Sequence, residues 1–215
     1  MPEPNNPLTP DYYWNEKLRR YQNIYTGRIV SNAEVRAGLD AVILSAKQET
    51  RTLTSALLNG EISIKDWQDR MAYLLKTQTL ASYALAKGGW GQMTPQDFGR
   101  AGAELKKQYA YLQKFALDIQ NGKISFDGRI LTRADLYSER ARGTFEDVRR
   151  EMARAEGFDR ERRVLGIADH CRTCVIEANK GWRPLGTLRA IGDSLCGTNC
   201  HCNFEFGRSI DGASF

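Results

Sequence analysis

Residues 169–174 read Asp-His-Cys-Arg-Thr-Cys, and residues 196–202 read Cys-Gly-Thr-Asn-Cys-His-Cys. All five cysteines and both histidines of the 215-residue chain lie within these two stretches. A Cys-x2-Cys turn points two sulfur atoms at one place, and a second cysteine cluster returned by a loop can complete the tetrahedral set of a structural Zn²⁺ site. The odd number of cysteines and their spacing argue against disulfide bonds. The sequence therefore predicts one structural zinc site in residues 165–207.

The ligands of this site are drawn from five thiols. Cys171 and Cys174 form the first pair, while three later cysteines compete for the two remaining places. In an extended chain the side chains of Cys200 and Cys202 share a face, so spacing does not choose between them. The expected ligands are Cys171, Cys174, Cys196 and Cys200, with Cys202 as the alternate.

The same stretches resemble the C-terminal signature of the phage head morphogenesis family, the minor head proteins of tailed phages that are similar to protein F of phage Mu. The family pattern is Asp-x2-Thr-Cys-x2-Cys, a glycine-containing loop, and His-x2-Cys-Arg-Cys. The matching runs here are Ala-Asp-His-Cys-Arg-Thr-Cys at 168–174, Gly-Trp-Arg-Pro-Leu-Gly-Thr-Leu at 181–188 and Asn-Cys-His-Cys at 199–202. Cys196 stands near the place of the family's histidine, one residue further upstream, and His201 replaces the family's arginine.

The resemblance covers residues 129–206 and does not reach residues 1–128. It implies a structural protein of a phage head with no catalytic residues, present in a few copies inside or beneath the capsid near the portal. Its role would be head assembly or DNA delivery. The partners implied are a portal or major capsid protein, with packaged DNA as a further candidate. The location implied is the virion head, or the host cytoplasm during assembly.

Composition restricts the alternatives. Hydrophobic residues make up 41% of the chain, and no apolar run approaches the ~20 residues that span a bilayer, so we expect no membrane contact. Residues 1–7 lack the basic and apolar segments of a secretory signal, which favours a reducing cytoplasm. The formal net charge is +5. A Zn²⁺ ion held by four thiolates is a −2 unit and lowers this charge to about +3, which does not by itself indicate a strong DNA binder.

The type of basic residue changes along the chain. Residues 1–128 contain 9 Lys and 7 Arg, whereas residues 129–215 contain 1 Lys and 14 Arg. The change coincides with the start of the resemblance and predicts a boundary near residue 128. An arginine edge on the helix that follows could face DNA or an acidic portal surface, and a solvated, salt-bridged face is the simpler use of it. The candidate partner-binding arginines are Arg133, Arg140, Arg149 and Arg150.

Three long helices joined by short connections are expected before that boundary. Capping residues begin them at Ser31, Ser63 and Thr94. Glycine-containing stops end them at 59–60, 87–89 and 121–122. Apolar residues recur at alternating steps of three and four, which predicts a mainly α fold with an elongated antiparallel helical bundle. The seams include Val42, Ala46, Leu53 and Leu57 in the first helix, Trp67, Met71, Leu74 and Gln78 in the second, and Leu105, Leu112, Ala116 and Ile119 in the third.

The stretch before these helices is rich in aromatic residues. Thr-Pro-Asp at 9–11 predicts the start of a short helix that carries Tyr12, Tyr13 and Trp14. Packing within the molecule is the simpler use of this cluster. We also name it as the candidate partner-binding surface, because aromatic anchors dominate interfaces.

The C-terminal part begins with an extended piece at 125–130 and a fourth helix capped at Thr132. A strand is expected at 203–206, ahead of a polar tail. The predicted organisation is a flexible arm (1–9), a helical bundle (10–128), an Arg-rich helix with its connector (129–164), a zinc-binding module with short β structure, a zinc knuckle (165–207), and a tail (208–215).

Two other functions remain open. The sequence contains no Gly-rich phosphate loop, no Ser-His-Asp pattern and no His-Glu-x2-His, and we expect no enzyme and no small-molecule substrate. A zinc-dependent HNH-like nuclease would need a second metal site, for which only Asp169, His170, His201 and Asn203 are candidates. A zinc-knuckle module that binds nucleic acid is favoured by the arginines and opposed by the small net charge.

Overall fold

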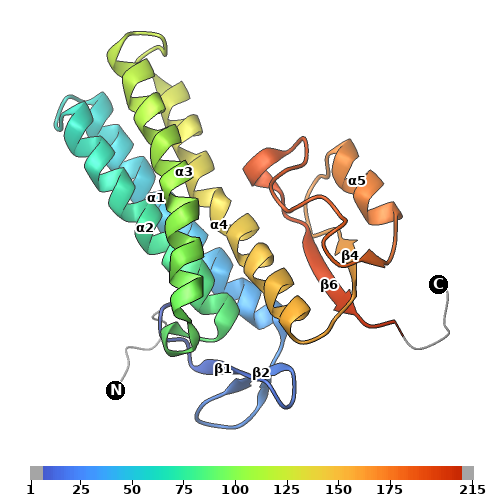
Figure 1. Ribbon diagram of the computed structural model, residues 1–215. Coiled ribbons are helices and arrows are strands. Elements are labelled where there is room, and N and C mark those ends of the chain that lie inside the picture. Colours follow the sequence, from blue (N-terminus) through green and yellow to red (C-terminus); the bar gives the residue numbers. More distant parts are fainter. Residues whose placement is uncertain (1–6, 210–215) are drawn as a thin grey trace. The chain divides into compact units, whose positions relative to one another are not determined.

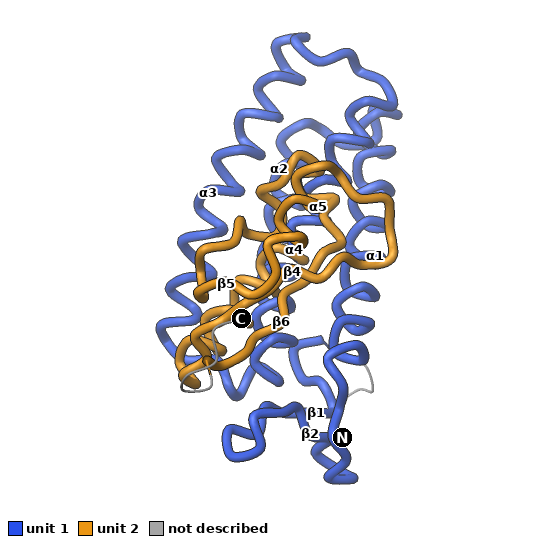
Figure 2. Tube along the Cα trace, turned by 90° about the vertical axis from the view of Figure 1, so that its right-hand side faces the viewer, with its two compact units in different colours: residues 1–141 blue, residues 142–215 orange. Residues whose placement is uncertain are grey.

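The computed structural model describes residues 7–209 (Figure 1). The expected arm at 1–9 and tail at 208–215 therefore lie mostly outside the described residues. The described chain is mainly helical, with two small antiparallel sheets. It divides into two compact units, residues 1–141 and residues 142–215 (Figure 2).

The bounds of the elements follow chain order. They are β1 Tyr12–Asn15, β2 Arg20–Asn23, β3 Ile29–Val30, α1 Asn32–Leu58, α2 Ile64–Lys87, the 3₁₀ turn η1 Trp90–Gln92, α3 Pro95–Gln120, α4 Gly128–Ala155, β4 Arg160–Val164, α5 Arg172–Asn179, β5 Arg183–Pro184, the 3₁₀ turn η2 Gly197–Asn199 and β6 Asn203–Gly207. No helix within the described part of the chain is long and apolar enough to cross a membrane.

The three predicted helix starts are confirmed. Ser31 accepts the N–H of Glu34 and the Glu34 carboxylate accepts the N–H of Ser31, which closes a capping box at the start of α1. Ser63 caps α2 through its side chain, and Thr94 forms a second capping box with Asp97 at the start of α3. These caps satisfy N–H groups that a first helical turn leaves without partners.

The two Asn-Gly stops use one turn geometry. Gly60 and Gly122 take φ angles of 74° and 67°, a left-handed conformation that glycine adopts without strain. After α1, the N–H of Glu61 reaches back to the carbonyl of Ala56. After α3, Lys123 does the same toward Asp118. The short connections that these turns make place consecutive helices side by side (Figure 1).

The core of the first unit is apolar and draws on all four long helices. Trp67 of α2 is fully buried and meets Phe115 of α3 edge to face, with 5.4 Å between ring centroids. The Trp67 indole N–H donates to Thr54 Oγ1 at 3.1 Å, so its polar atom is satisfied. The rest of this core comprises Leu53, Leu57, Met71, Leu75, Leu105, Leu112, Ala116, Ile119, Ile130 and Ala134.

Part of the predicted seam is displaced by one residue. Ile43 and Leu75 are buried, whereas the expected seam residues Val42 and Leu74 are only half-buried. A straight helix has 3.6 residues per turn, whereas alternating steps of three and four average 3.5 residues. A seam predicted with these steps therefore moves away from the core side along the helix. The residues left outside the core line an open groove between α1 and α2.

The short helix predicted to carry Tyr12, Tyr13 and Trp14 is wrong. This stretch forms the antiparallel sheet β1-β2-β3, in which Trp14 pairs with Tyr21. The sheet docks on the end of α2, where the hydroxyl of Tyr12 donates to the carbonyl of Leu85 at 3.2 Å and that of Tyr21 to the carbonyl of Ala86 at 2.6 Å. Two carbonyls that lie at the open end of a helix gain partners in this way.

Glycine is required where the sheet meets α2. Gly88 has a φ of 88°, and a Cβ added there would lie 2.4 Å from the backbone nitrogen of Trp14. No side chain fits so close to a backbone atom.

The predicted start of the fourth helix is also wrong. Residues 125–130 do not form an extended piece, because α4 begins at Gly128 rather than near Thr132. Asp127 explains the earlier start, since its side chain accepts the N–H of Arg129 at 2.9 Å. The division between the two units falls inside α4, between Ala141 and Arg142.

The second unit contains the end of α4 and a three-stranded sheet in the order β5-β4-β6. Strand β6, predicted at 203–206, is confirmed and pairs antiparallel with β4 so that Arg163 stands opposite Phe204. Helix α5 and the loop that carries η2 bring the cysteines together beside this sheet.

Candidate metal centre

The five cysteines occupy the ends of short elements. Cys171 is the N-cap of α5, and Cys174 lies in its first turn. Cys196 and Cys200 flank the 3₁₀ turn η2, and Cys202 directly precedes β6. Their neighbours are the buried apolar side chains Leu188, Ile191 and Phe204.

The sulfur atoms lie close enough to share a metal ion. Cys174 Sγ is 3.6 Å from the sulfur of Cys196 and 3.6 Å from that of Cys200. Sulfur atoms around a tetrahedral Zn²⁺ at ~2.3 Å would be about 3.8 Å apart. In two groups of three thiols all sulfur atoms lie within 4.8 Å of one another, and both groups contain Cys174: one adds Cys171 and Cys196, the other Cys200 and Cys202. The cysteine cluster could therefore hold a metal ion, as predicted.

Two of the thiols, those of Cys171 and Cys200, have a lowered pKa and therefore lose their protons more easily. Burial opposes ionisation of Cys171, but the backbone N–H groups of Cys174 and Cys196 donate to its sulfur, and the pKa is lowered to about 7. The Cys202 thiol donates to Cys200 and, with backbone N–H groups that include that of Gly192, lowers the pKa of Cys200 to about 4 despite burial. A thiolate is the form that binds metal.

The other two shifted thiols favour the protonated state. The hydrogen bond to Cys200, together with burial, raises the pKa of Cys202. Burial and hydrogen bonds to Cys171 and Cys174 raise that of Cys196. Cys202 also lies 3.8 Å from Nδ1 of His170, whose Nε2 is 2.8 Å from the carbonyl oxygen of Gly166. The geometry brings all five thiols together and leaves Cys196, Cys200 and Cys202 as competing ligands.

Sequence reasoning missed the charged residues buried beside the cysteines. Arg163 of β4 is 3% exposed, and its Nη1 lies 3.4 Å from Cys174 Sγ. Glu161, two residues earlier, is fully buried and accepts hydrogen bonds from the guanidinium of Arg150 and from the N–H of Leu188. Both residues sit in a run of five, Arg-Glu-Arg-Arg-Val, whose polarity suggested a connector rather than a buried strand. The only sequence signal was the two-residue spacing of Glu161 and Arg163, which puts them on one face of a strand.

The predicted aromatic partner site is largely packed within the first unit. Tyr12 is 6% exposed and lies edge to face with Tyr21. Its burial raises its pKa well above the usual value. Tyr13 and Trp14 are half-buried, and the hydroxyl of Tyr13 donates to Gln22 at 2.7 Å. Packing within the molecule, the simpler use named above, accounts for these contacts.

The predicted partner-binding arginines also have contacts within the chain. Arg133 lies over the ring of Phe115 at 4.3 Å, and Arg140 pairs with Glu104 at 3.4 Å. In the second unit Arg149 is 9% exposed and lies 5.7 Å from the ring centroid of Phe206. Arg150 is bound to Glu161 at 2.8 Å. The four arginines do not form one free basic edge.

The candidates for a nuclease centre differ in exposure. His201 and Asp169 are exposed, and His170 and Asn203 are half-buried. Among residues 7–209, the groups of three or more metal-ligating side chains that lie close together consist of cysteines alone.

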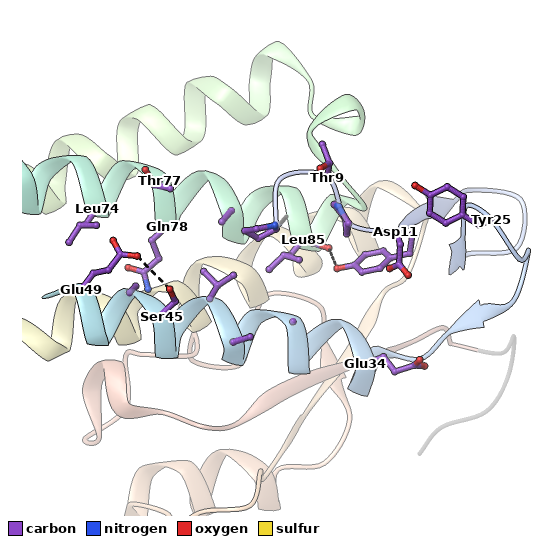
Figure 3. A pocket seen from close by; sticks show the side chains of 18 residues that line it. Thr9, Asp11, Tyr25, Glu34, Ser45, Glu49, Leu74, Thr77, Gln78 and Leu85 are labelled. Carbon is purple, nitrogen blue, oxygen red and sulfur yellow. Dashed lines mark hydrogen bonds between the residues drawn. The ribbon is translucent and has the colours of Figure 1, made fainter. Parts of the chain in front are cut away.

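A second surface feature lies in the first unit, between α1 and α2. This groove has a volume of about 870 Å³ and a floor that includes Val42, Ala46 and Ala81. Figure 3 shows Glu49 at one end of it, with Asp11 and Glu34 toward the other. None of its 18 described lining residues is lysine or arginine, although the chain contains 31 of them. The groove is therefore apolar in its depth and has carboxylates at its ends, of which Glu34 is paired with Arg28 at 2.6 Å.

Comparisons with protein-family models, curated proteins and solved structures find no match to this chain.

Proposed function

We propose that the protein is a non-enzymatic head morphogenesis protein of a tailed phage, which acts in capsid assembly or at the portal and carries a structural zinc site. The observation that supports this proposal is the convergence of the signature residues. Cysteines from 171–174 and 196–202, which carry the resemblance to the family, come within metal-binding distance in one module.

Zinc suits this donor set better than other biological ions. Thiolates are soft ligands, and four of them close a tetrahedral site around Zn²⁺ with no position left for water or substrate. Such a site stabilises a fold and does not catalyse a reaction. Cys171 and Cys174 supply two ligands, and the other two come from Cys196, Cys200 and Cys202.

The groove is the surface that we propose for a protein partner in the head. Its span from Glu34 to Glu49 corresponds to about 22 Å of helix at ~1.5 Å per residue, the length of a short recognition helix. The small side chains Ala41 and Ala46 allow close approach of another backbone. Glu34 is paired with Arg28, whereas Glu49 forms no ion pair among the described residues. An unpaired carboxylate repels phosphates and attracts Lys or Arg, so Glu49 favours a basic, amphipathic helix of a portal or capsid protein over DNA.

Co-expression with a phage portal protein encoded in the same genome tests the proposal. We expect the two proteins to purify together and the complex to contain about one zinc per copy of this chain. Ala41→Arg should weaken the complex at least tenfold, because the new side chain fills the groove and repels a basic partner. Ala37→Arg is the matched control, since Ala37 is also exposed on α1 but does not line the groove. Equal binding by both variants would exclude the groove, and no association of the wild type with portal or major capsid protein would overturn the proposed function.

The nuclease is the alternative, and DNA cleavage separates it from the structural role. Pure protein incubated with DNA and Mg²⁺ or Mn²⁺ should leave the DNA intact. Cleavage that disappears on His170→Ala or His201→Ala would replace the structural proposal with the nuclease.

A further inference from the structure

Strand β4 sends two adjacent arginines to opposite faces of its sheet. Arg162 is exposed, pairs with Glu205 of β6 and lies over the ring of Trp182. Arg163 is 3% exposed and points to the cysteine cluster. This alternation is the ordinary consequence of the strand's two-residue period.

The guanidinium of Arg163 connects three parts of the second unit. Its Nη1 donates to Cys174 Sγ at 3.4 Å and to Ser194 Oγ at 3.0 Å, and lies 3.9 Å from Cys200 Sγ. Its Nη2 donates to the backbone carbonyls of Arg189 and Ala190. One side chain thus joins the Cys-x2-Cys turn, the second cysteine cluster and the loop between them.

No carboxylate is bound directly to this buried charge: Glu177 interacts with it electrostatically, but its oxygens accept from Lys180 and from the N–H of Arg189. Among residues 7–209, Arg163 forms no ion pair within 4.0 Å, and its Nε has no hydrogen-bond partner. Glu161, on the same face of β4, is already bound to Arg150. A buried charge without a directly bound counter-charge costs several kcal/mol, and the sulfur atoms that Nη1 faces can supply that counter-charge as thiolates.

We propose that Arg163 is a positioning residue of the metal centre, whose guanidinium balances the negative charge of the bound thiolates and holds Cys174 and Cys200 as ligands. The inference rests on the proposed zinc site. Four thiolates and one Zn²⁺ carry a net charge of −2, and one guanidinium reduces it to −1. The centre and Arg163 are each costly to bury alone, and each lowers the cost of burying the other.

The geometry also assigns Cys200 a place among the competing thiols. Arg163 Nη1 faces Cys174 and Cys200, whereas the polar contact that Cys202 makes outside the cysteine cluster, among the described residues, is with His170. An N–H donor beside a sulfur stabilises its anionic, metal-bound form. Cys200→Ser should therefore weaken metal binding more than Cys202→Ser.

The experiment measures Zn²⁺ affinity of the full chain by competition with a chromogenic chelator, and the absorption of the Co²⁺-substituted protein. Arg163→Gln should lower the affinity by about 10- to 100-fold, the usual effect of removing a partner of a metal ligand. It should also shift the thiolate-to-Co²⁺ charge-transfer band to longer wavelength, because sulfur electrons that lose a nearby positive charge rise in energy. A purely structural defect would reduce the band without moving it.

Two further variants make the test decisive. Arg162→Gln, on the adjacent residue of the same strand, should leave both affinity and spectrum unchanged. Arg163→Lys keeps the charge and should bind Zn²⁺ nearly as tightly as the wild type, so it decides the matter if Arg163→Gln does not fold. Two results would overturn this inference while the zinc site stands: affinity and spectrum of Arg163→Gln that equal those of Arg162→Gln, or an affinity of Arg163→Lys that is 10-fold or more below that of the wild type. A wild type that binds no ion would overturn both.

Discussion

The two units are stabilised by different means. The first unit buries a continuous apolar core that extends from Leu53 to Ala134, with Trp67 and Phe115 at its centre. The second unit, about half as long, buries a smaller apolar cluster together with five charged side chains: Glu146, Arg149, Glu161, Arg163 and Glu177. Apolar burial needs no further component, whereas buried charges and clustered thiols need partners. The comparison predicts a first unit that folds on its own core and a second unit that depends on the proposed metal ion.

Removal of the metal should produce the largest difference in stability between the two units. Structural Zn²⁺ contributes on the order of 10 kcal/mol to domains of this kind, more than the whole stability of a small module. A strong chelator should therefore unfold residues 160–207 and leave α1, α2 and α3 intact. Hydrogen exchange followed by mass spectrometry measures both at once. Protection of α5 and β6 that survives chelation in metal-free protein would contradict the comparison.

An ionisable group placed in the apolar core should have the next largest effect. Leu105 is 8% exposed inside the first unit, so Leu105→Asp leaves a carboxylate without a partner and should cost about 4–5 kcal/mol. Leu74→Asp is the matched variant, because Leu74 is half-buried at the groove, where water can reach the carboxylate. Urea unfolding should show a loss for Leu74→Asp that is at most half as large. Equal losses would mean that the groove is closed in solution.

The charged interior of the second unit can be tested with a similar pair. Glu161→Gln keeps the shape of the side chain but leaves the buried guanidinium of Arg150 without its counter-charge, at a cost of about 3 kcal/mol. Glu205→Gln removes the exposed partner of Arg162 and should cost less than about 1 kcal/mol. Both losses of stability can be measured by thermal unfolding of the zinc-loaded protein, with hydrogen exchange of the β4 amides as the readout for the second unit. A loss for Glu205→Gln as large as that for Glu161→Gln would show that burial does not set the strength of these pairs.

The parts that sequence could predict are those that local chemistry determines. Ser31 with Glu34, Thr94 with Asp97, and the glycines after α1 and α3 each act within four residues, and their patterns identify the ends of the helices. The cysteines are similar, since their spacing limits where the sulfur atoms can go. The gathering of the thiols could therefore be predicted, although the choice among Cys196, Cys200 and Cys202 could not.

The parts that sequence missed depend on distant neighbours. Thr-Pro-Asp at 9–11 matches a helix start, but the side chains of Tyr12 and Tyr21 find carbonyls at the end of α2, more than sixty residues away. Aromatic residues fit a strand at least as well as a helix, so tertiary contacts decide. The role of Arg163 was missed for the same reason, because its partners Cys174 and Arg189 come near β4 only in the folded unit.

The smallest effect concerns the junction between the β1-β2-β3 sheet and α2. Tyr12→Phe removes one hydroxyl and leaves the carbonyl of Leu85 without its side-chain partner, while the ring keeps its contact with Tyr21. The loss of one buried hydrogen bond should cost about 1 kcal/mol. Tyr13→Phe is the control, since its hydroxyl bonds to the side chain of Gln22 near the surface, where water can replace it. Urea unfolding should separate the two variants by several tenths of a kcal/mol. The same variant can be tested for binding to the portal protein. If Tyr12→Phe still binds, then Tyr12 contributes to the fold of the first unit, and the partner binds the groove beside it.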